Sequence, residues 1–429
     1  MDTIIAHVDC ASFYASVERV FHAGLQKRPV IVLSNGDGCV VAASEEAKAL
    51  GVVRGTPLFR IKQLVEEHDI ALYSSNYVLY QDVSDRIMAL LATFARQRRG
   101  EVYSIDEGFI DVSHVPPSQL MDYGKAIIAH ILRLTGIPVR VGFGRSKTQA
   151  KLATHLVKRD PGGPGVVDLV SIPQEALDAL LATVSVEDIW NVGPKTSAKL
   201  QIREIISAKD LRDADPQWIR RFLHVVGERI VYELRGMVCL PLELDPKPKK
   251  GIIVARSFGR AIENSEELTE ALCHYLAVAT AKMRRQASAA RFISIYVLTN
   301  PFDESTPQYA NSASRHLPFH SAFPPDFFTI IQDLLASIYR PGHRYKRAGV
   351  FLSDIRPTSV TQADLFGAFS RAEYERKRHL MLVIDRINER LGHDTIGFLA
   401  QGITRDWQAR QKHLSKRFTT QWTELLSVQ

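Results

Sequence analysis

The chain has 429 residues, of which 45% are hydrophobic and 24% are charged, the ordinary balance of a soluble globular protein. This length exceeds what one hydrophobic core can support, so a single-domain protein is excluded and three or four domains are expected. The net charge of +7 is modest, but much of the excess lies in two stretches, Lys247, Lys249, Lys250, Arg256 and Arg260, and Arg405, Arg410, Lys412, Lys416 and Arg417. Such clusters favour a polyanionic partner, although two solvated surface runs would give the same pattern.

Cysteine usage and the lack of export or membrane signals indicate the compartment. The four cysteines are widely separated and form no C-x-x-C pair, which favours free thiols over disulfides or a zinc site. The N-terminus lacks the basic region of a signal peptide, and no run of 18 apolar residues is present. We therefore expect a cytoplasmic protein without a membrane segment.

Residues 1–185 alternate between strand and helix patterns. Strands are predicted at 3–9, 29–33, 39–43, 101–104, 109–113 and 139–143, and helices at 44–50, 77–94, 118–135 and 147–157. The run Gly142-Phe143-Gly144 predicts a strand end, and Ser146 is the expected cap of the helix that follows.

Beyond the Gly-Pro segment 161–165 the pattern changes. Short helices separated by Pro and Gly occupy about 172–240, and the Pro- and Lys-rich stretch that follows is typical of a linker. Residues 251–356 then predict strand (252–258), helix (265–285), strand (290–299), helix (325–339) and strand (345–354), a small α+β domain with helices on one sheet face. From Pro357 onward a polar, largely helical tail is expected.

Two acidic clusters lie in strand-like surroundings. Asp9 closes the first apolar strand, and the adjacent pair Asp106 and Glu107 lies within 103–112, which is rich in aromatic and β-branched residues. Buried carboxylates are costly unless they are paired or bound to a metal, and carboxylates that converge at strand ends form an oxygen-rich site suited to Mg²⁺. Alternatively, these acids cap turns or pair with surface Lys and Arg.

Two further segments suggest binding. Residues 190–200 read as a helix-hairpin-helix, which aims backbone N–H groups at a DNA phosphate, with Asn191 where a glycine is usual. An ordinary helical packing unit is the alternative. Gln362, Leu365 and Phe366 form a short apolar motif in a polar stretch, which suits docking into a partner's hydrophobic pocket. No G-x-x-x-x-G-K-[ST], G-x-S-x-G or H-E-x-x-H motif is present, which disfavours P-loop ATPases, common hydrolases and zinc proteases.

Together these features resemble the Y-family translesion DNA polymerases over essentially the whole chain. The run 104–107 is similar to the family's S-I-D-E motif, Asp9 to its first metal-binding aspartate, and Tyr14 to its steric-gate residue. Segments 33–40, 73–77, 311–314, 398–403 and 414–420 are similar to the UmuC type within that family, which comprises the catalytic subunit of DNA polymerase V and its plasmid homologues.

The resemblance implies an α+β multidomain fold, a right-hand polymerase with a ferredoxin-like palm, small fingers, a helix-hairpin-helix thumb and an α+β little finger. The implied boundaries are 1–15 and 75–171 for the palm, 16–74 for the fingers, 172–240 for the thumb, 241–250 for the linker, 251–356 for the little finger and 357–429 for a tail with a clamp-binding motif.

The resemblance also implies the site and the partners. Two Mg²⁺ ions would be held by Asp9, Asp106 and Glu107, with the backbone carbonyl of Cys10 as a further ligand. The implied nucleotide-binding residues are Phe13, Tyr14, Lys48 and Lys158, the DNA-binding residues are Val192, Gly193, Lys195, Thr196, Lys249, Lys250 and Arg256, and the clamp-binding residues are Gln362, Leu365 and Phe366. Expected partners are primer–template DNA, dNTPs, a sliding clamp, a UmuD′-like accessory dimer and RecA.

This sequence departs from the family pattern at Ala42 and Glu45, where many members carry a hydroxyl and an aromatic near the triphosphate. Two rival functions remain, a non-catalytic DNA-binding scaffold and a nucleotidyl cyclase. The presence of all three acids argues against the scaffold, and the hairpin, the basic domain and the clamp-like motif argue against the cyclase. Primer extension on an abasic template separates these possibilities.

Overall fold

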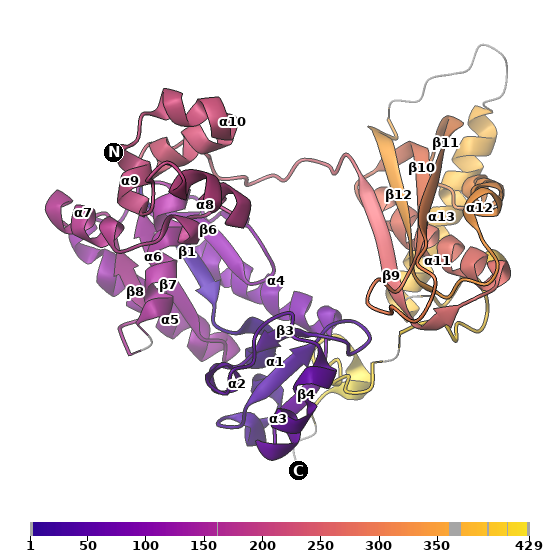
Figure 1. The fold of residues 1–429 in the computed structure, drawn as a ribbon, viewed down its shortest axis with the longest axis horizontal. Helices are drawn as coiled ribbons and strands as arrows, with labels where there is room; N and C mark the ends of the chain where they lie inside the picture. Colours follow the sequence, from indigo (N-terminus) through magenta and orange to yellow (C-terminus); the bar gives the residue numbers. More distant parts are fainter. Residues whose placement is uncertain (1–2, 161, 360–369, 393, 410, 427–429) are drawn as a thin grey trace. The chain divides into compact units, whose positions relative to one another are not determined.

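The computed structural model describes residues 3–160, 162–359, 370–392, 394–409 and 411–426 (Figure 1). The chain forms two compact units, which we call the N-terminal unit (Met1–Pro246 with Lys412–Gln429) and the C-terminal unit (Lys247–Gln411). All four cysteines are free thiols, as expected. Within the described ranges no helix combines the length and the apolar character that crossing a bilayer requires.

A five-stranded sheet forms the centre of the N-terminal unit. Its order is β5 (Gly100–Val102), β6 (Glu107–Asp111), β1 (Ile5–Cys10), β7 (Val139–Gly144) and β8 (Val166–Asp168), with β1 antiparallel to both neighbours. All six residues of β1 are buried, because helices cover both faces of the sheet. Helices α4 (Tyr77–Thr93) and α5 (Leu120–Thr135) pack on the face that carries Ala6 and Val8, and α6 (Lys147–Arg159) packs on the opposite face.

A smaller, three-stranded sheet follows β1 in the chain. Its strand order is β3 (Val40–Ala43), β2 (Val30–Leu33) and β4 (Ala71–Ser74). It packs with α2 (Glu45–Ala49) and α3 (Lys62–Glu67) around a core of its own, and α1 (Phe13–Phe21) lies against β2 and β3. Short 3-10 turns complete the connections: η1 (Ala23–Leu25), η2 (Leu58–Arg60), η3 (Pro117–Gln119), η4 (Val186–Asp188), η5 (Leu399–Gln401) and η6 (Trp422–Glu424).

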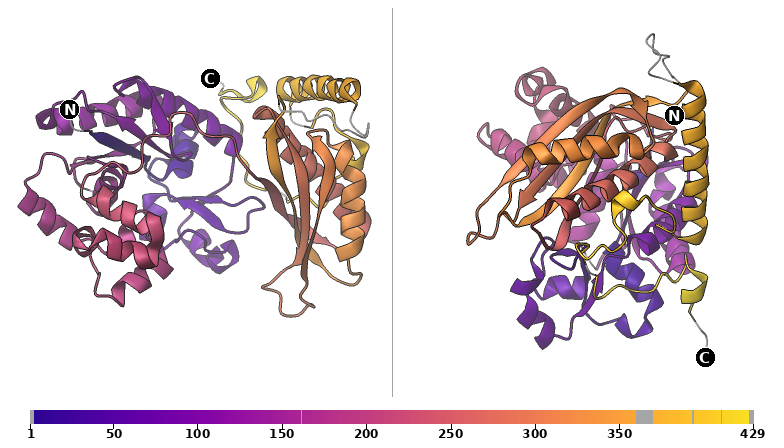
Figure 2. Two further views of the ribbon diagram at one scale, coloured as in Figure 1. Left: turned by 90° about the horizontal axis from the view of Figure 1, so that it is seen from above. Right: turned by 90° about the vertical axis from the view of Figure 1, so that its right-hand side faces the viewer.

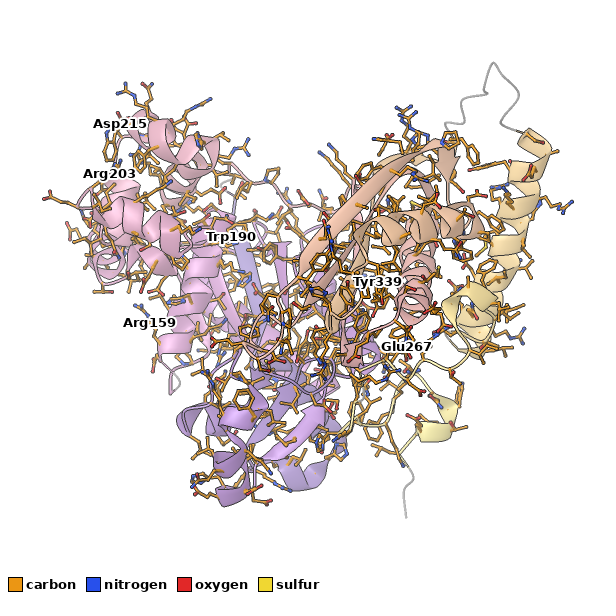
Figure 3. All side chains as sticks on the ribbon, turned by 45° about the vertical axis from the view of Figure 1, so that its right-hand side comes forward. Arg159, Trp190, Arg203, Asp215, Glu267 and Tyr339 are labelled. Carbon is orange, nitrogen blue, oxygen red and sulfur yellow. The ribbon has the colours of Figure 1, made fainter. Side chains whose placement is uncertain are left out.

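Four helices form the last part of the N-terminal unit: α7 (Gln174–Ala182), α8 (Pro194–Gln201), α9 (Ala208–Asp213) and α10 (Pro216–Leu234). Arg203 and Asp215, both labelled in Figure 3, belong to this helical part. Asn191 has φ 69°, the left-handed conformation expected of it, and Gly193 is the N-cap residue of α8. Trp190 lies against the sheet, and its indole Nε1 donates to Tyr103 Oη over 3.1 Å.

The C-terminal unit is a four-stranded antiparallel sheet in the order β11 (Ala310–Ser321), β10 (Ser288–Thr299), β12 (Tyr345–Pro357) and β9 (Ile252–Ile262). Helices α11 (Ser265–Arg285) and α12 (Pro325–Ile338) cover one face of it (Figure 2). Every predicted element is present, but the edge strand β11 was not predicted. Its residues are mostly polar and exposed, so it lacks the apolar alternation by which a strand is recognised.

The tail differs from the expectation of a largely helical segment. Only α13 (Arg371–Leu391) and two 3-10 turns are helical, and the remaining described residues are irregular. Residues 394–409 also belong to the C-terminal unit, whereas 412–426 belong to the N-terminal unit, so the expected segment 357–429 is not one structural part.

Trp407 anchors the first half of this tail in the core of the C-terminal unit. The ring is buried among Phe258, His274 and Tyr275, and the Trp407 carbonyl accepts a hydrogen bond from Gly259 N over 2.8 Å. A side chain at Gly259 would overlap the backbone of Gln408, so glycine is needed where the tail crosses β9. The C-terminal unit therefore extends beyond the predicted end at residue 356.

Truncating this anchor should destabilise the C-terminal unit. Trp407→Ala removes a fully buried ring, and we expect a loss of about 3–5 kcal/mol in the free energy of unfolding. Urea denaturation of the full chain, followed by circular dichroism, measures the loss. Trp422→Ala is the matched control, because Trp422 is 88% exposed and should tolerate truncation. Equal stability of the two variants would show that residues 394–409 contribute nothing to this core.

Candidate active site

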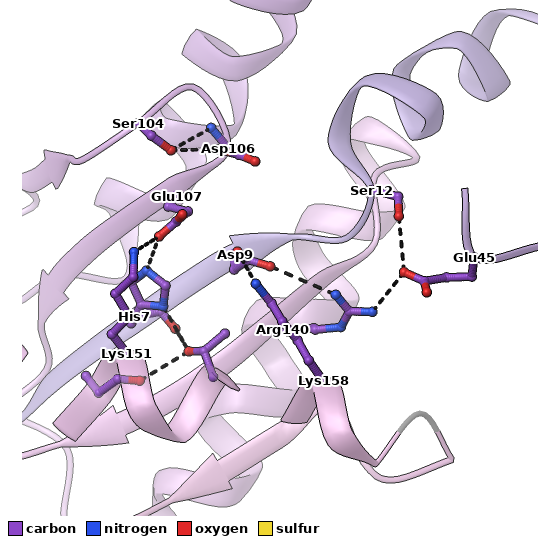
Figure 4. A network of polar contacts seen from close by, with 12 residues as sticks. His7, Asp9, Ser12, Glu45, Ser104, Asp106, Glu107, Arg140, Lys151 and Lys158 are labelled. Carbon is purple, nitrogen blue, oxygen red and sulfur yellow. Dashed lines mark hydrogen bonds and ion pairs between the residues drawn. The ribbon is translucent and has the colours of Figure 1, made fainter. Parts of the chain in front are cut away.

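The sheet register brings the predicted acidic residues together. Asp9 near the end of β1 lies directly opposite Glu107, the first residue of β6. Asp106 immediately precedes β6, and its carbonyl accepts a hydrogen bond from Cys10 N over 2.9 Å. Carboxylates nearly 100 residues apart in sequence thus lie at adjacent positions on neighbouring strands (Figure 4).

Helix α6 supplies cations to two of these carboxylates. Lys158 Nζ donates to Asp9 Oδ2 over 2.8 Å, and Lys151 Nζ donates to Glu107 Oε2. The two lysines are seven residues apart, which places them on one helical face. That face lies against β1, because Thr154 Oγ1 between them is 2.9 Å from His7 Nδ1 (Figure 4).

His7 and Arg140 complete the surroundings of the carboxylates. His7 Nε2 lies 2.9 Å from Glu107 Oε2, and since a carboxylate only accepts, this nitrogen carries the proton. Arg140 on β7, the strand on the other side of β1, has its guanidinium 4.0 Å from Asp9 Oδ1. Cationic or hydrogen-bonding groups therefore face Asp9 and Glu107 from both α6 and the sheet.

The local sequence explains why α6 lies so close to the sheet. A Cβ atom at Gly142 or Gly144 would overlap the backbone of α6, so glycine at both positions permits the close packing. Ser146 is the N-cap, as predicted, and accepts from Gln149 N over 3.2 Å. The buried carboxylate of Glu233 on α10 accepts from Thr148 N over 3.0 Å, which holds the helix start in place.

Asp106 and Glu107 differ in their affinity for protons. Burial raises the pKa of Asp106, and the negative charges of Asp9 and Glu107 raise it further, although a hydrogen bond from Ser104 opposes them. Burial alone would also raise the pKa of Glu107, but hydrogen bonds from His7 and Lys151 outweigh it and lower that pKa to about 2. Burial and repulsion within the cluster thus destabilise the ionised form of Asp106, and a bound cation would remove this destabilisation.

The donor set fits a hard divalent cation by its chemistry, since carboxylate and carbonyl oxygens are the ligands that Mg²⁺ prefers. The part of the chain that the structure describes contains no ready-made cluster of three or more His, Cys, Asp or Glu side chains with metal-binding geometry. Lys151 and Lys158 instead hold the oxygens of Glu107 and Asp9. Metal ligands at these positions would have to exchange their lysine partners for the ion.

A second polar cluster surrounds Glu45, one of the two positions that depart from the family pattern. Its Oε1 accepts from Ser12 Oγ over 3.1 Å, Lys48 Nζ over 3.0 Å and Arg140 over 3.3 Å. Lys48 also donates to Ser12 Oγ over 2.9 Å, so this predicted nucleotide-binding cation is paired within the cluster. Because Arg140 lies near both Asp9 and Glu45, the cluster is continuous with the acidic site.

Tyr14 lies beside the acidic cluster in a group of aromatic rings. Its ring stacks on Tyr80 of α4 with centroids 4.5 Å apart and meets Tyr77 edge-on at 5.9 Å. Burial, Tyr77 and the charge of Asp106 raise the pKa of Tyr14 to about 12, so its hydroxyl stays protonated. The neighbouring Phe13 is buried in the core.

The other predicted binding residues lie elsewhere. In the hairpin, Gly193 and Lys195 are exposed, Thr196 is half-buried and Val192 is buried. Lys249, Lys250 and Arg256 are exposed residues of the C-terminal unit. Gln362, Leu365 and Phe366 lie outside the described residues.

Sequence analysis did not single out His7, Arg140, Lys151 or Thr154. The seven-residue spacing of Lys151 and Lys158 in a predicted helix was the one available signal for Lys151. His7 lies two residues before Asp9 and therefore shares its side of the strand, which could have linked the two. Nothing in the local sequence indicates Arg140, because strand pairing alone brings it to Asp9.

Known proteins resemble this chain over nearly its whole length. Residues 8–155 match the model of the impB/mucB/samB family, and residues 249–365 match that family's C-terminal domain. Residues 378–428 match a domain of unknown function, which spans residues of both structural units. Protein UmuC of Salmonella typhimurium is 41% identical over 99% of this chain and 100% of its own length.

More distant relatives extend the comparison. Protein MucB of Escherichia coli is 36% identical over 98% of this chain and 99% of its own length, and DNA polymerase IV of Desulfatibacillum aliphaticivorans is 27% identical over 92% and 96%. Among solved structures, a Y-family DNA polymerase chimera of Dbh and Dpo4 aligns with a TM-score of 0.65 at 20% identity, covering 82% of this chain and 99% of that one.

The fold is therefore that of the Y-family DNA polymerases, as the resemblance implied. The sequence relatives identify the family within this class, because they match at 36–41% identity along essentially the full chain. The chain belongs to the impB/mucB/samB family.

Proposed function

We propose that this chain is a template-directed DNA polymerase of low fidelity that extends primers across damaged DNA. The observation that carries the proposal is the pairing of Asp9 with Glu107 across adjacent strands, with Asp106 beside them and Tyr14 on the next helix. Relatives named UmuC, MucB and DNA polymerase IV support the reaction class. The proposed cellular role is translesion synthesis in the SOS response, in the cytoplasm.

Asp9, Asp106 and Glu107 would hold two Mg²⁺ ions, with the Cys10 carbonyl as a further ligand. Bound there, the ions would neutralise the phosphates and clamp the attacking and leaving oxygens of nucleotidyl transfer. The protein would contribute by holding the carboxylate oxygens on two paired strands. Lys151 and Lys158 would leave those oxygens when the ions bind. The released ammonium groups would then be free for other anions, and Lys158, with Lys48, would face the triphosphate.

The proposal also extends to the parts that the family implies. We assign the five-stranded sheet to the palm, the three-stranded sheet to the fingers, α7–α10 to the thumb and the C-terminal sheet to the little finger. The exposed start of α8 would meet a DNA phosphate, as would the exposed Lys249, Lys250 and Arg256. A UmuD′-like dimer and RecA remain proposed partners, by family resemblance.

Primer extension on an abasic template, with dNTPs and Mg²⁺, tests the function. The proposal requires metal-dependent incorporation opposite and beyond the lesion. A scaffold that only binds DNA would give no extension, and a nucleotidyl cyclase would consume a nucleotide without lengthening the primer.

Asp106→Asn should abolish extension while the protein still folds and binds primer–template. The amide keeps the shape of the side chain but removes the charge that a second metal ion requires. Incorporation in Mg²⁺ and the melting temperature should be measured on the same preparation, with the exposed Asp122→Asn as control. Substantial extension by the Asp106 variant would refute the two-metal assignment.

Tyr14→Ala should admit ribonucleotides. A flat ring under the sugar leaves no room for a 2′-hydroxyl, so its removal should increase rNTP incorporation while dNTP incorporation persists. Tyr14→Phe is the matched control, because it keeps the ring and loses only the hydroxyl. Competition between a dNTP and the matching rNTP measures the selectivity. Unchanged selectivity in Tyr14→Ala would show that the ring only packs in the core.

Leu365→Ala with Phe366→Ala should weaken binding to the replicative sliding clamp at least tenfold, which requires a loss of only about 1.4 kcal/mol. Apolar and aromatic anchors of this kind commonly carry ~2 kcal/mol or more apiece in an interface. Extension without the clamp should survive. Ser359→Ala with Thr361→Ala is a control from the same stretch. Unaltered clamp affinity together with a lowered melting temperature would place the motif in the domain core instead.

A further inference from the structure

The end of the chain returns to the small sheet of the N-terminal unit. Lys412 N donates to Asp37 Oδ2 over 2.7 Å, in the loop between β2 and β3. His413 N donates to Ser74 Oγ over 3.0 Å, and Ser74 N donates to the His413 carbonyl over 2.9 Å. Residues 412–420, which we call the docked segment, are therefore bound to Ser74 at the end of β4 by one backbone hydrogen bond and one bond to the serine hydroxyl.

An aromatic anchor fixes the other end of the docked segment. Phe418 is buried and stacks on Phe21 of α1 with ring centroids 4.7 Å apart and planes 9° from parallel. The His22 ring meets Phe418 edge-on at 5.4 Å. The docked segment thus joins the small sheet to α1, the helix that carries Tyr14.

Ser415 lies between these anchors and connects to the interior. Its hydroxyl donates to Glu18 Oε1 over 2.9 Å, and the same oxygen accepts from Tyr80 Oη over 2.6 Å. Tyr80 is the ring on which Tyr14 stacks, with centroids 4.5 Å apart and planes 16° from parallel. One continuous series of contacts therefore runs from the tail to Tyr14, through Ser415, Glu18 and Tyr80.

The Glu18 carboxylate makes this series of contacts sensitive to the loss of a hydrogen-bond donor. It is fully buried, and its Oε2 finds no hydrogen-bond partner among the described residues. Burial raises the pKa of Glu18, while the hydrogen bonds from Tyr80 and Ser415 oppose that rise. Because a buried carboxylate depends on its few donors, loss of the Ser415 hydroxyl would force Glu18, and Tyr80 with it, to reposition.

Asn76 connects the docked segment to the same helix that carries Tyr80. Its side-chain Nδ2 donates to the Ser415 carbonyl over 3.0 Å and to Ser415 Oγ over 3.1 Å. Its Oδ1 accepts from Leu79 N over 3.3 Å and so caps the start of α4. Ser415 thus contacts Glu18, which accepts a hydrogen bond from the Tyr80 hydroxyl. It also contacts Asn76, which caps the helix that carries Tyr80.

We propose that the docked segment positions Tyr14, and that Ser415 determines sugar selectivity by holding Glu18 and Tyr80 behind the Tyr14 ring. Ser415 acts through other residues and touches no substrate itself. This inference rests on the proposed function, because it takes Tyr14 as the residue that excludes the 2′-hydroxyl.

The test is single-nucleotide incorporation by the full-length chain, with kcat and KM measured for a correct dNTP and for its rNTP counterpart. Ser415→Ala should lower the preference for the dNTP about tenfold, a change of about 1.4 kcal/mol. The change should arise mainly from a lower KM for the rNTP, because a displaced ring makes room for the 2′-hydroxyl. Ser415→Thr, which keeps the hydroxyl, should restore the preference.

Two further variants separate positioning from general destabilisation. Thr420→Ala alters an exposed residue of the same segment and should leave the preference unchanged. Tyr80→Phe keeps the stacking ring but loses the bond to Glu18, so it should resemble Ser415→Ala. The double variant should fall short of the sum of the two single effects, because both act on one carboxylate.

The outcomes distinguish this inference from the function on which it rests. If Tyr14→Ala relaxes sugar selectivity and Ser415→Ala does not, the tail proposal is wrong and the steric-gate assignment stands. If Tyr14→Ala has no effect, both fall. If Ser415→Ala lowers kcat equally for both sugars together with the melting temperature, the segment is only structural and the proposal is overturned.

Discussion

The close packing of α6 on the central sheet is the constraint on which the candidate site depends. Three carboxylates lie at the end of β1 and the start of β6, where Asp9 is buried and Asp106 and Glu107 are half-buried. Such a cluster is unstable without nearby positive charge. Lys151 and Lys158 supply it, and they reach the carboxylates only because Gly142 and Gly144 let the helix approach the strands.

The two lysines also bear on the proposed metal site. Each lysine pairs with one carboxylate, while burial, together with the repulsion of its two acidic neighbours, raises the pKa of Asp106. With ions held by the carboxylates as proposed, Lys151 and Lys158 would no longer pair with Glu107 and Asp9. The same two lysines, which stabilise the carboxylates by pairing with them, would then be free to bind anions in the proposed metal-bound state.

The tail contributes residues to both units. Trp407 holds residues 394–409 in the C-terminal core, and Phe418 with Ser415 holds residues 412–420 against α1 and α4. The segment matched by the domain of unknown function therefore contributes to both units and forms no separate body. Its second half contacts Glu18, the carboxylate that accepts a hydrogen bond from Tyr80, on whose ring Tyr14 stacks.

The sequence by itself determined the identity of the acidic residues, the order of most strands and helices, and the family. These follow from local patterns: apolar alternation, capping residues and a short motif such as 104–107 each depend on neighbours in the chain. Only the tertiary structure decided which charges meet. The partnership of Arg140 with both Asp9 and Glu45 follows from strand pairing, and the bond from Ser415 to Glu18 joins residues 397 positions apart. The edge strand β11 and the division of the tail were likewise beyond the sequence, because polar, irregular segments carry no periodic signal and take their place from the surfaces that they meet.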